Sequence, residues 1–272
     1  MRLSDGTAII LFRFHDGFDR ARERVLLLQH YNPRLKIYAL FGGPATDKAA
    51  ALEAMQGLAE AVWTYPGNKP KDWKWRHTDL MLKAWYRTVG RHLDFDFLYS
   101  YEYDLLTLKP LGKIYPDIDD HTLALSACEP FTKEIEYRWS WTAFEPSRTN
   151  FLKFCDYLEK HYGFRRQQKV CLGPGPLFPR AFLDQWSKTE DIELVHDEIA
   201  YPAYAEALGF KMVDHGMHPG FGLQPDEKYF NCEHHPVTLG MITEQLAKPQ
   251  GRRTFHPVTA RITVEDILDY AS

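Results

Sequence analysis

The sequence lacks several features that mark well-known classes of protein. No apolar run approaches the roughly 18 residues of a membrane-spanning helix, so we expect no transmembrane segment, although peripheral contact with a membrane stays open. The first residues lead directly into a short apolar run without the layout of a signal peptide. No G-x-G-x-x-G follows that run, which argues against classical dinucleotide binding.

Cysteine is scarce and positive charge is not in excess. The four cysteines are Cys128, Cys155, Cys171 and Cys232, and no two of them form a C-x-x-C pair. This spacing argues against a zinc ribbon and against a disulfide framework, so we expect reduced thiols in a cytoplasmic protein. The formal net charge is −4, so we do not expect a general nucleic-acid-binding protein.

The apolar residues that are present predict an α/β domain. Of the 272 residues, 44% are apolar, which suffices for one large core or two small ones. Short β-rich runs alternate with helical stripes over the first hundred residues, which favours a mainly parallel, twisted sheet flanked by helices. The expected strands span 7–15, 36–41, 62–65 and 95–104. The expected helices span 19–31 and 79–93, and another begins near Asp47, with an apolar stripe reaching Val62.

The pattern changes after residue 104, where we expect a smaller, mixed portion of the same continuous domain. Strands are predicted at 122–128, 169–172 and 211–213, and helices at 149–161, 180–187, 196–207, 241–246 and 264–270. Residues 173–176 (Gly-Pro-Gly-Pro) are predicted to form a rigid loop. Residues 214–236 are rich in Gly, Pro and His and show little periodicity, which is typical of a functional loop or lid.

The main candidate for a functional site lies in the stretch from Phe95 to Asp104. We interpret it as a buried strand ending in two carboxylates, Glu102 and Asp104. Side chains two positions apart in a strand point the same way, so both would face one spot beyond its carboxyl end, where ligands bind in open α/β sheets. Two converging carboxylates suit a hard divalent cation such as Mg²⁺ or Mn²⁺. The alternative is an ordinary solvated strand end.

With these features together, the sequence resembles glycosyltransferases of the GT-A type. The resemblance depends on the β-α-β half followed by the acid-x-acid pair, on His-Asp-Glu-x-x-x-Pro-x-x-Ala-x-x-Leu-Gly-Phe at 196–210, and on the late Phe255-His256-Pro257. It implies that 1–104 bind a nucleotide sugar and that 105–272 bind the acceptor. The first acid is Glu102, where Asp is more usual, so this residue would reach the ion through water or contact the ribose.

The resemblance also implies roles for individual residues. The metal ion, Mn²⁺ or Mg²⁺, would be held by Glu102, Asp104 and His256. The acceptor hydroxyl would lose its proton to Asp197 or Glu198, although acids at a helix start also serve as caps. The donor would contact Phe14, His15, Asp16, Gly42, Gly43 and Glu102. The acceptor would contact Trp141, Gly173 and Gly175.

The implied reaction transfers a sugar from a nucleotide-diphosphate donor to a hydroxyl of a glycan or glycolipid. Two alternatives stay open: a metal-dependent hydrolase or nucleotidyl-group enzyme, and a catalytically silent sugar- or nucleotide-binding module. The adjacent Cys232, Glu233, His234 and His235 form a rival cluster, but neighbouring side chains point apart and suit one ion poorly. Arg252 and Arg253 are interpreted as a solvated basic pair rather than as phosphate ligands.

Overall fold

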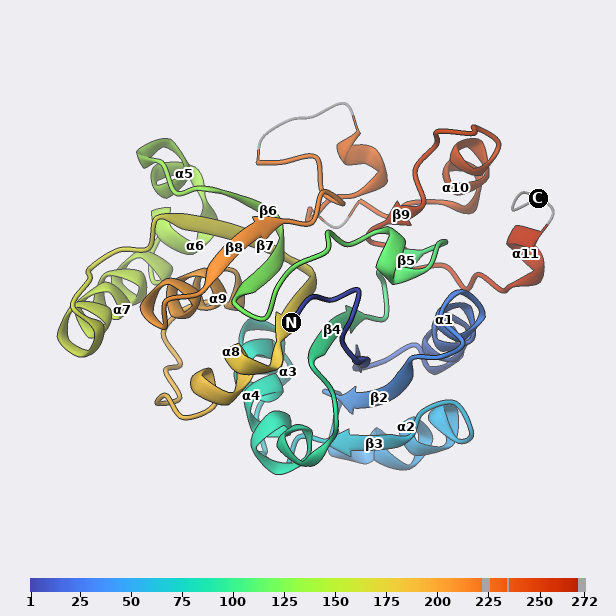
Figure 1. The fold of residues 1–272 in the computed structure, drawn as a ribbon, viewed down its shortest axis with the longest axis horizontal. Coiled ribbons are helices and arrows are strands. Elements are labelled where there is room, and N and C mark those ends of the chain that lie inside the picture. The colour runs from blue at the N-terminus through green and yellow to red at the C-terminus, as the bar shows by residue number, and fades with distance from the viewer. Residues whose placement is uncertain (222–225, 234, 269–272) are drawn as a thin grey trace.

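A seven-stranded sheet forms the centre of the molecule in the computed structural model, which describes residues 1–221, 226–233 and 235–268. The strand order is β3-β2-β1-β4-β7-β6-β8, and only β7 runs against the others (Figure 1). The strands are β1 (Ala8–Phe14), β2 (Lys36–Phe41), β3 (Ala61–Thr64), β4 (Phe97–Glu102), β6 (Thr122–Pro130), β7 (Lys169–Pro179) and β8 (Lys211–Asp214). The predicted class, a mainly parallel sheet flanked by helices, is confirmed.

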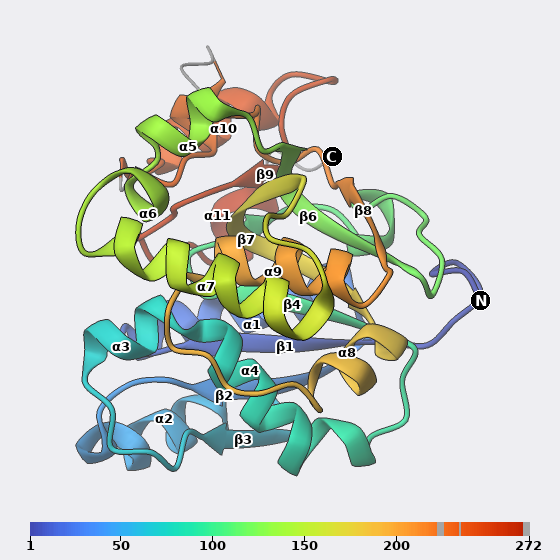
Figure 2. The ribbon, with the colours of Figure 1, turned by 90° about the vertical axis from the view of Figure 1, so that its left-hand side faces the viewer.

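Helices cover both faces of this sheet because its central strands are apolar on both sides. Along β1, Ile9 and Leu11 pack into one core, whereas Ile10 and Phe12 pack into another, as alternation requires. The first core includes residues of α4 (Thr78–Thr88), α7 (Ser147–Tyr162), α8 (Arg180–Trp186) and α9 (Asp197–Ala207) (Figure 2). The second includes residues of α1 (Phe18–Tyr31) and α2 (Lys48–Met55).

The C-terminal segment returns to the end of β4. β9 (Thr254–Phe255) pairs antiparallel with β5 (Leu106–Thr107), and the Val258 N–H donates to the Asp104 carbonyl at 2.8 Å. A third core joins this segment to α1 and α10 (Leu239–Leu246). These contacts place residue 256 beside residue 104, although the two are far apart in sequence. The shorter helices are α3 (Lys71–Arg76), α5 (Lys133–Arg138), α6 (Ser140–Ala143) and α11 (Glu265–Leu268).

Several predicted elements have bounds that differ from those expected, and the helix predicted at 79–93, for example, ends at Thr88. The helix near Asp47 ends at Met55 rather than continuing to residue 62, because Gly57 adopts a left-handed conformation with φ of 73° and the chain then enters β3. Residues 173–176 lie within β7 and do not form a separate loop. The pairing of β6 with β7 shifts register twice. The first shift spans Pro174 and Pro176, which lack the N–H that a regular ladder needs, and the second lies at Ala127, where φ is 44°. Of the helix predicted at 264–270, residues 265–268 are helical and 269–270 lie outside the described residues.

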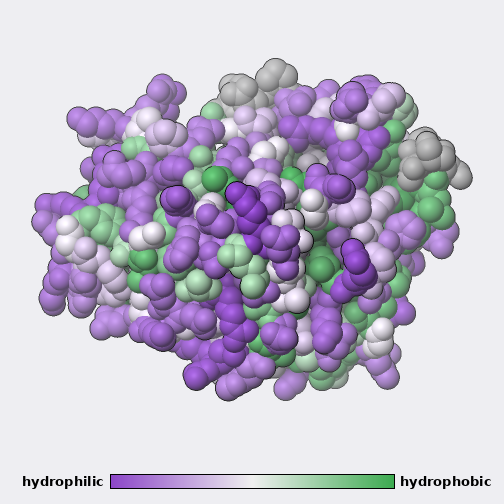
Figure 3. Space-filling model, in the orientation of Figure 1, coloured by the Kyte–Doolittle hydropathy of each residue, from purple (hydrophilic) through white to green (hydrophobic). Residues whose placement is uncertain are grey.

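The surface in the view of Figure 3 is mostly hydrophilic, with apolar residues in scattered groups. Within the described ranges, no helix combines the length and apolarity needed to cross a bilayer. All four cysteines are free, with Cys155 and Cys171 buried and Cys128 and Cys232 half-buried.

Candidate active site

A single large cleft gathers most of the residues predicted from the sequence. Its volume is about 960 Å³, and it lies at the carboxyl ends of β1, β2 and β4. Parallel strands end together at this edge, which is where open α/β sheets bind ligands. The predicted residues that line the cleft are Phe14, His15, Gly42, Glu102, Asp104, Trp141, Gly173, Asp197, Glu198 and His256.

The two acids after β4 do not share one face of a strand, so that prediction is wrong. The strand ends at Glu102, and the chain turns at once, with the Leu105 N–H donating to the Glu102 carbonyl. The Glu102 carboxylate forms an ion pair with the buried Arg13, its register partner on β1, and accepts the Gly175 N–H at 3.0 Å. Its charge is therefore matched within the protein, whereas Asp104 lies beyond the end of the strand.

Asp104 instead lies beside His256. The Asp104 Oδ1 and His256 Nε2 atoms are 3.7 Å apart, and both side chains are mostly shielded from solvent. The His256 Nδ1 lies 2.6 Å from the Asn231 carbonyl, which can only accept, so Nδ1 carries a proton. In the neutral ring this leaves the Nε2 lone pair on the side of Asp104, the orientation that a carbonyl gives to a metal-binding histidine.

These residues fit a divalent cation only in part. Among the residues that the structure describes, no group of three His, Cys, Asp or Glu side chains lies close enough to hold one ion. The expected set of Glu102, Asp104 and His256 is therefore not assembled. One carboxylate and one imidazole do suit an ion whose other ligands are substrate phosphates and water, as is usual for Mg²⁺ and related ions.

The remaining donor-side predictions divide into residues that face the cleft and residues that do not. His15 lines the cleft, where burial lowers its pKa, and its ring packs edge-on against Tyr103 at 4.8 Å. Phe14 lines the cleft but is also a core residue, packed on Phe41. Asp16 is outside the lining and pairs with Arg20 at 3.0 Å.

The two glycines after β2 have different environments. Gly42 lines the cleft, as predicted for close approach to a ligand. Gly43 does not, and a Cβ there would lie 2.4 Å from the His15 carbonyl oxygen and 2.3 Å from the Phe41 ring. Packing within the protein therefore explains Gly43 without a ligand.

On the acceptor side, the start of α9 places two buried carboxylates in the cleft. Asp197 accepts a hydrogen bond from the Thr78 hydroxyl, and its Oδ1 lies 2.8 Å from the His196 Nδ1. Burial favours the neutral forms of both partners, but their mutual attraction dominates, so the pKa of Asp197 is lowered and that of His196 is raised. The lowered pKa makes Asp197 a weak base, and its carboxylate already contacts Thr78 and His196.

Glu198 has a different environment. Its Oε1 accepts the Gly173 N–H at 2.8 Å and its Oε2 accepts the Trp141 indole N–H at 2.8 Å, so two predicted acceptor-side residues position this carboxylate. Burial raises the pKa of Glu198 above its ordinary value, although His196 opposes the shift. Gly175 lies outside the lining; its φ is 71°, and a Cβ there would meet the Tyr115 hydroxyl at 2.9 Å.

Several residues that line or support the cleft were not predicted from the sequence. Arg13 and Thr78 each bond one of the predicted acids, and Lys71 and Trp75 of α3 line the cleft as well. The sequence did offer a signal for Arg13, which is a charged residue one position before the end of an apolar strand. In the fold it pairs in register with Glu102. His218, in the long loop, also lines the cleft, and burial lowers its pKa to about 4.

Asp79 is a buried acid that does not line the cleft. Burial, followed by the charge of Asp197, raises its pKa from 3.8 to about 7. The folded protein thus holds this proton between about pH 4 and pH 7 while the unfolded chain has released it. Stability therefore falls as pH rises through that range, and the cost is complete above pH 7.

We expect Asp79→Asn to raise the free energy of unfolding at pH 8 by about 2–4 kcal/mol, because the amide cannot ionise. At pH 5, where the unfolded chain has released this proton but the folded protein keeps it, the variant should exceed the parent by only about 1–2 kcal/mol. Denaturant unfolding at the two pH values measures both differences, with the exposed Asp94→Asn as control. An equal difference at pH 5 and pH 8 would show that ionisation of Asp79 is not the cause.

Other charged candidates from the sequence lie outside the cleft or contribute little to it. Arg252 donates to the Met217 carbonyl at 2.8 Å, and Arg253 donates to carbonyls at the end of α10, so neither faces the cleft. Cys232 and Glu233 line the cleft, whereas His235 is largely exposed. His234 lies outside the described residues.

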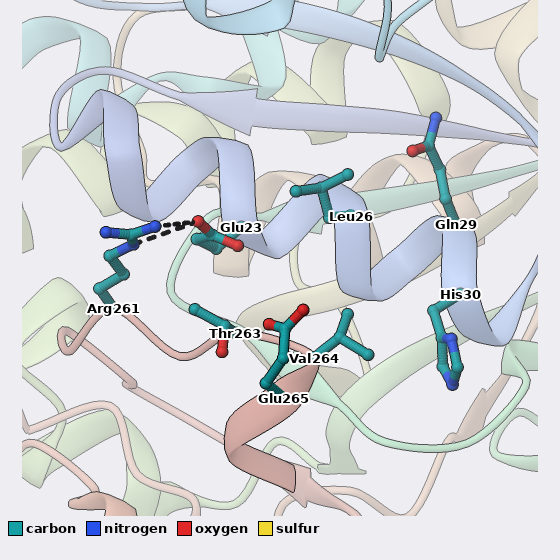
Figure 4. Close-up of a pocket in the computed structure, with 8 residues that line it drawn as sticks. All are labelled: Glu23, Leu26, Gln29, His30, Arg261, Thr263, Val264 and Glu265. Carbon is teal, nitrogen blue, oxygen red and sulfur yellow. Dashed lines mark hydrogen bonds and ion pairs between the residues drawn. The ribbon is translucent and has the colours of Figure 1, made fainter. Parts of the chain in front are cut away.

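A second hollow, of about 700 Å³, lies between α1 and the segment before α11 (Figure 4). Arg261 points toward α1 and bonds Glu23 through its Nε at 3.1 Å. This pair neutralises the main charges of the hollow, and none of the predicted functional residues lines it.

No protein-family profile and no curated protein matches the sequence. Solved structures similar in fold include the galactosyltransferase LgtC with donor and acceptor sugar analogues (14% identity; 75% of this chain, 72% of that chain; TM-score 0.39). The bifunctional glycosyltransferase WbbM is 9% identical, with 98% of this chain and 50% of that chain covered and a TM-score of 0.42. For 4-diphosphocytidyl-2C-methyl-D-erythritol synthase the identity is 12%, the covered shares are 81% of this chain and 95% of that chain, and the TM-score is 0.42. Each of these similarities concerns fold alone.

Proposed function

We propose that the protein is a glycosyltransferase that moves a sugar from a nucleotide-diphosphate donor to a hydroxyl of a glycan or glycolipid. One observation supports this most strongly. A single cleft holds Asp104 beside His256, a pair suited to a phosphate-bound cation, and also holds Glu198, a buried carboxylate of raised pKa suited to accept a proton. The proposal keeps the cytoplasmic location expected from the sequence.

On the donor side, we assign Asp104 and His256 to the diphosphate end of the substrate. A Mn²⁺ or Mg²⁺ ion held by these two residues and the phosphates would neutralise the charge that develops on the leaving diphosphate. Lys71 lines the same cleft with a side chain that is 70% exposed, and it can add a positive charge there. Gly42 and His15, at the ends of β2 and β1, would contact the nucleoside, and Glu102 holds Arg13 in place.

On the acceptor side, Glu198 is assigned as the base. The bond from the sugar to the diphosphate breaks as the bond to the acceptor oxygen forms, and the hydroxyl proton passes to Glu198. Trp141 and Gly173 hold the two carboxylate oxygens, which leaves each oxygen further lone pairs for the incoming hydroxyl. Asp197 orients His196 and Thr78, and its lowered pKa makes it the poorer of the two bases.

Product analysis tests this function against the nucleotidyl-group alternative. The protein would be incubated with Mn²⁺ and a panel of uridine, guanosine, cytidine and adenosine diphosphate sugars, with and without mono- and disaccharides. Parallel incubations would contain the nucleoside triphosphates and sugar 1-phosphates instead. We expect release of one nucleoside diphosphate. Release of pyrophosphate from a nucleoside triphosphate and a sugar phosphate, with no reaction of any sugar nucleotide, would contradict the proposal and favour the alternative.

A further inference from the structure

Helix α3 carries two tryptophans with different environments. Trp73 is held within the protein: its indole N–H donates to Glu193 at 2.8 Å, and its ring packs on Tyr65 at 5.5 Å. Trp75 lies on the cleft side of the same helix, with 47% of its surface exposed. The Lys74 ammonium donates to the Gly43 carbonyl at 2.8 Å. Contacts of the two residues before Trp75 therefore fix the helix, while about half of the Trp75 surface stays exposed.

The exposed ring belongs to an aromatic group beside the proposed base. The centroids of Trp75 and Trp141 are 5.6 Å apart, and those of Trp75 and His196 are 5.5 Å apart. Trp141 stacks on His196 at 4.2 Å with 9° between the planes. Since the Trp141 indole also donates to Glu198, only one ring separates Trp75 from the Glu198 carboxylate.

This arrangement is selective about what it can bind. An indole face offers apolar surface and a π-system but no charge, so it matches the C–H face of a flat, neutral ring. A pyranose has such a face and also has hydroxyls at its rim. A pyranose resting on Trp75 would extend past Trp141 and present a rim hydroxyl to Glu198. An aliphatic alcohol or a Ser or Thr side chain would leave the Trp75 face uncovered.

We propose that Trp75 is the stacking surface for a pyranose ring of the acceptor, so that the group glycosylated is a saccharide hydroxyl. This inference rests on the proposed transferase function. Trp141 and His196 pack against Trp75 and hold it at a fixed distance from Glu198. Trp75 packs on Trp141 and His196, whereas the proposed donor residues are Asp104 and His256, so loss of the indole should affect the acceptor and not the donor.

The test uses Trp75→Ala and Trp75→Phe in the full chain, with Tyr137→Ala as control, because Tyr137 is 64% exposed but lies outside the cleft. Nucleoside diphosphate release is measured first without acceptor, where water is the acceptor, and then against concentrations of methyl glycosides, lactose, maltose and cellobiose. We expect Trp75→Ala to leave release to water within about twofold and to raise the KM for the saccharide about tenfold, the effect of losing an aromatic stack. Trp75→Phe should recover most of this loss, and Tyr137→Ala should match the parent.

Two results would overturn the inference while leaving the transferase function intact. One is an unchanged saccharide KM in Trp75→Ala. The other is a parent enzyme that releases nucleoside diphosphate to water but transfers to none of the saccharides. If the parent releases no nucleoside diphosphate from any sugar nucleotide, the proposed function itself fails, and the inference falls with it.

Discussion

Replacing Glu198 with glutamine is expected to lower kcat by about two to four orders of magnitude, the usual contribution of a general base. The amide cannot take the acceptor proton, although its oxygen can still accept one of the two hydrogen bonds from Trp141 and Gly173. The other donor loses its partner, at a cost of about 1–3 kcal/mol in stability. Rates should therefore be measured well below the melting temperature of the variant.

Glu206→Gln is a matched control for this substitution. Glu206 also accepts two N–H groups, from Gln168 at 2.7 Å and Lys169 at 3.1 Å, and burial also raises its pKa. It lies outside the cleft, so its replacement repeats the structural change without touching the proposed base. We expect its kcat to stay close to that of the parent. A Glu198→Gln enzyme with more than about a tenth of the parent kcat would exclude Glu198 as the base.

The pH profile gives a second readout of the same residue. A base works in its deprotonated form, and the pKa of Glu198 is raised above 4.5 by burial. The parent rate should therefore fall as pH decreases through that raised pKa, and the residual rate of Glu198→Gln should lack this acid limb. If the limb persists unchanged in the variant, another group is responsible for it.

Asp104→Asn is expected to weaken Mn²⁺-dependent binding of a nucleoside diphosphate by about a hundredfold or more. The asparagine keeps an oxygen but loses the negative charge beside the His256 Nε2, and a hard divalent cation depends on that charge. Isothermal titration with uridine, guanosine, cytidine and adenosine diphosphates, each with Mn²⁺ and with EDTA, measures the effect. Binding in EDTA should be the same in parent and variant.

Glu102→Gln is the informative comparison for this experiment, because Glu102 is already bonded by Arg13 and Gly175. We expect it to lower stability, since it leaves the buried Arg13 without a counter-charge. We also expect it to retain most of the difference between Mn²⁺ and EDTA. If instead Glu102→Gln abolishes Mn²⁺ dependence and Asp104→Asn does not, the assignment of the ion to Asp104 and His256 is wrong.

Local patterns predicted the sheet well because short apolar runs and helical stripes report burial directly. The strands at β1, β2, β4, β6 and β8 and the helices at α1, α7, α8 and α9 lie close to their predicted positions. The failures occurred where backbone geometry overrides pattern. The left-handed Gly57 ends α2 early, and Pro174 and Pro176 within β7 led to the prediction of a loop instead of a strand.

The sequence predicted individual residues of the site but not the contacts between them. Strand-end acids and the acids that open α9 stand out in the sequence, and the fold brings them to one cleft. Which acid is bonded to which partner depends on long-range contacts: Arg13 with Glu102, Thr78 with Asp197, and Trp141 with Glu198. The surroundings of the two acids of α9 also shift their pKa values in opposite directions, down for Asp197 through His196 and up for Glu198 through burial. For that reason the sequence left Asp197 and Glu198 equivalent, whereas the structure distinguishes them.

The central claim is that the cleft binds the diphosphate of a nucleotide through a cation. Thermal unfolding of the parent with uridine, guanosine, cytidine and adenosine diphosphates, each with and without Mn²⁺, tests it most directly. A ligand that binds only the folded state raises the midpoint in proportion to ln(1 + [L]/Kd), so even modest affinity is visible. We predict a Mn²⁺-dependent rise with one of the four. No rise with any of them at millimolar concentration would contradict the account.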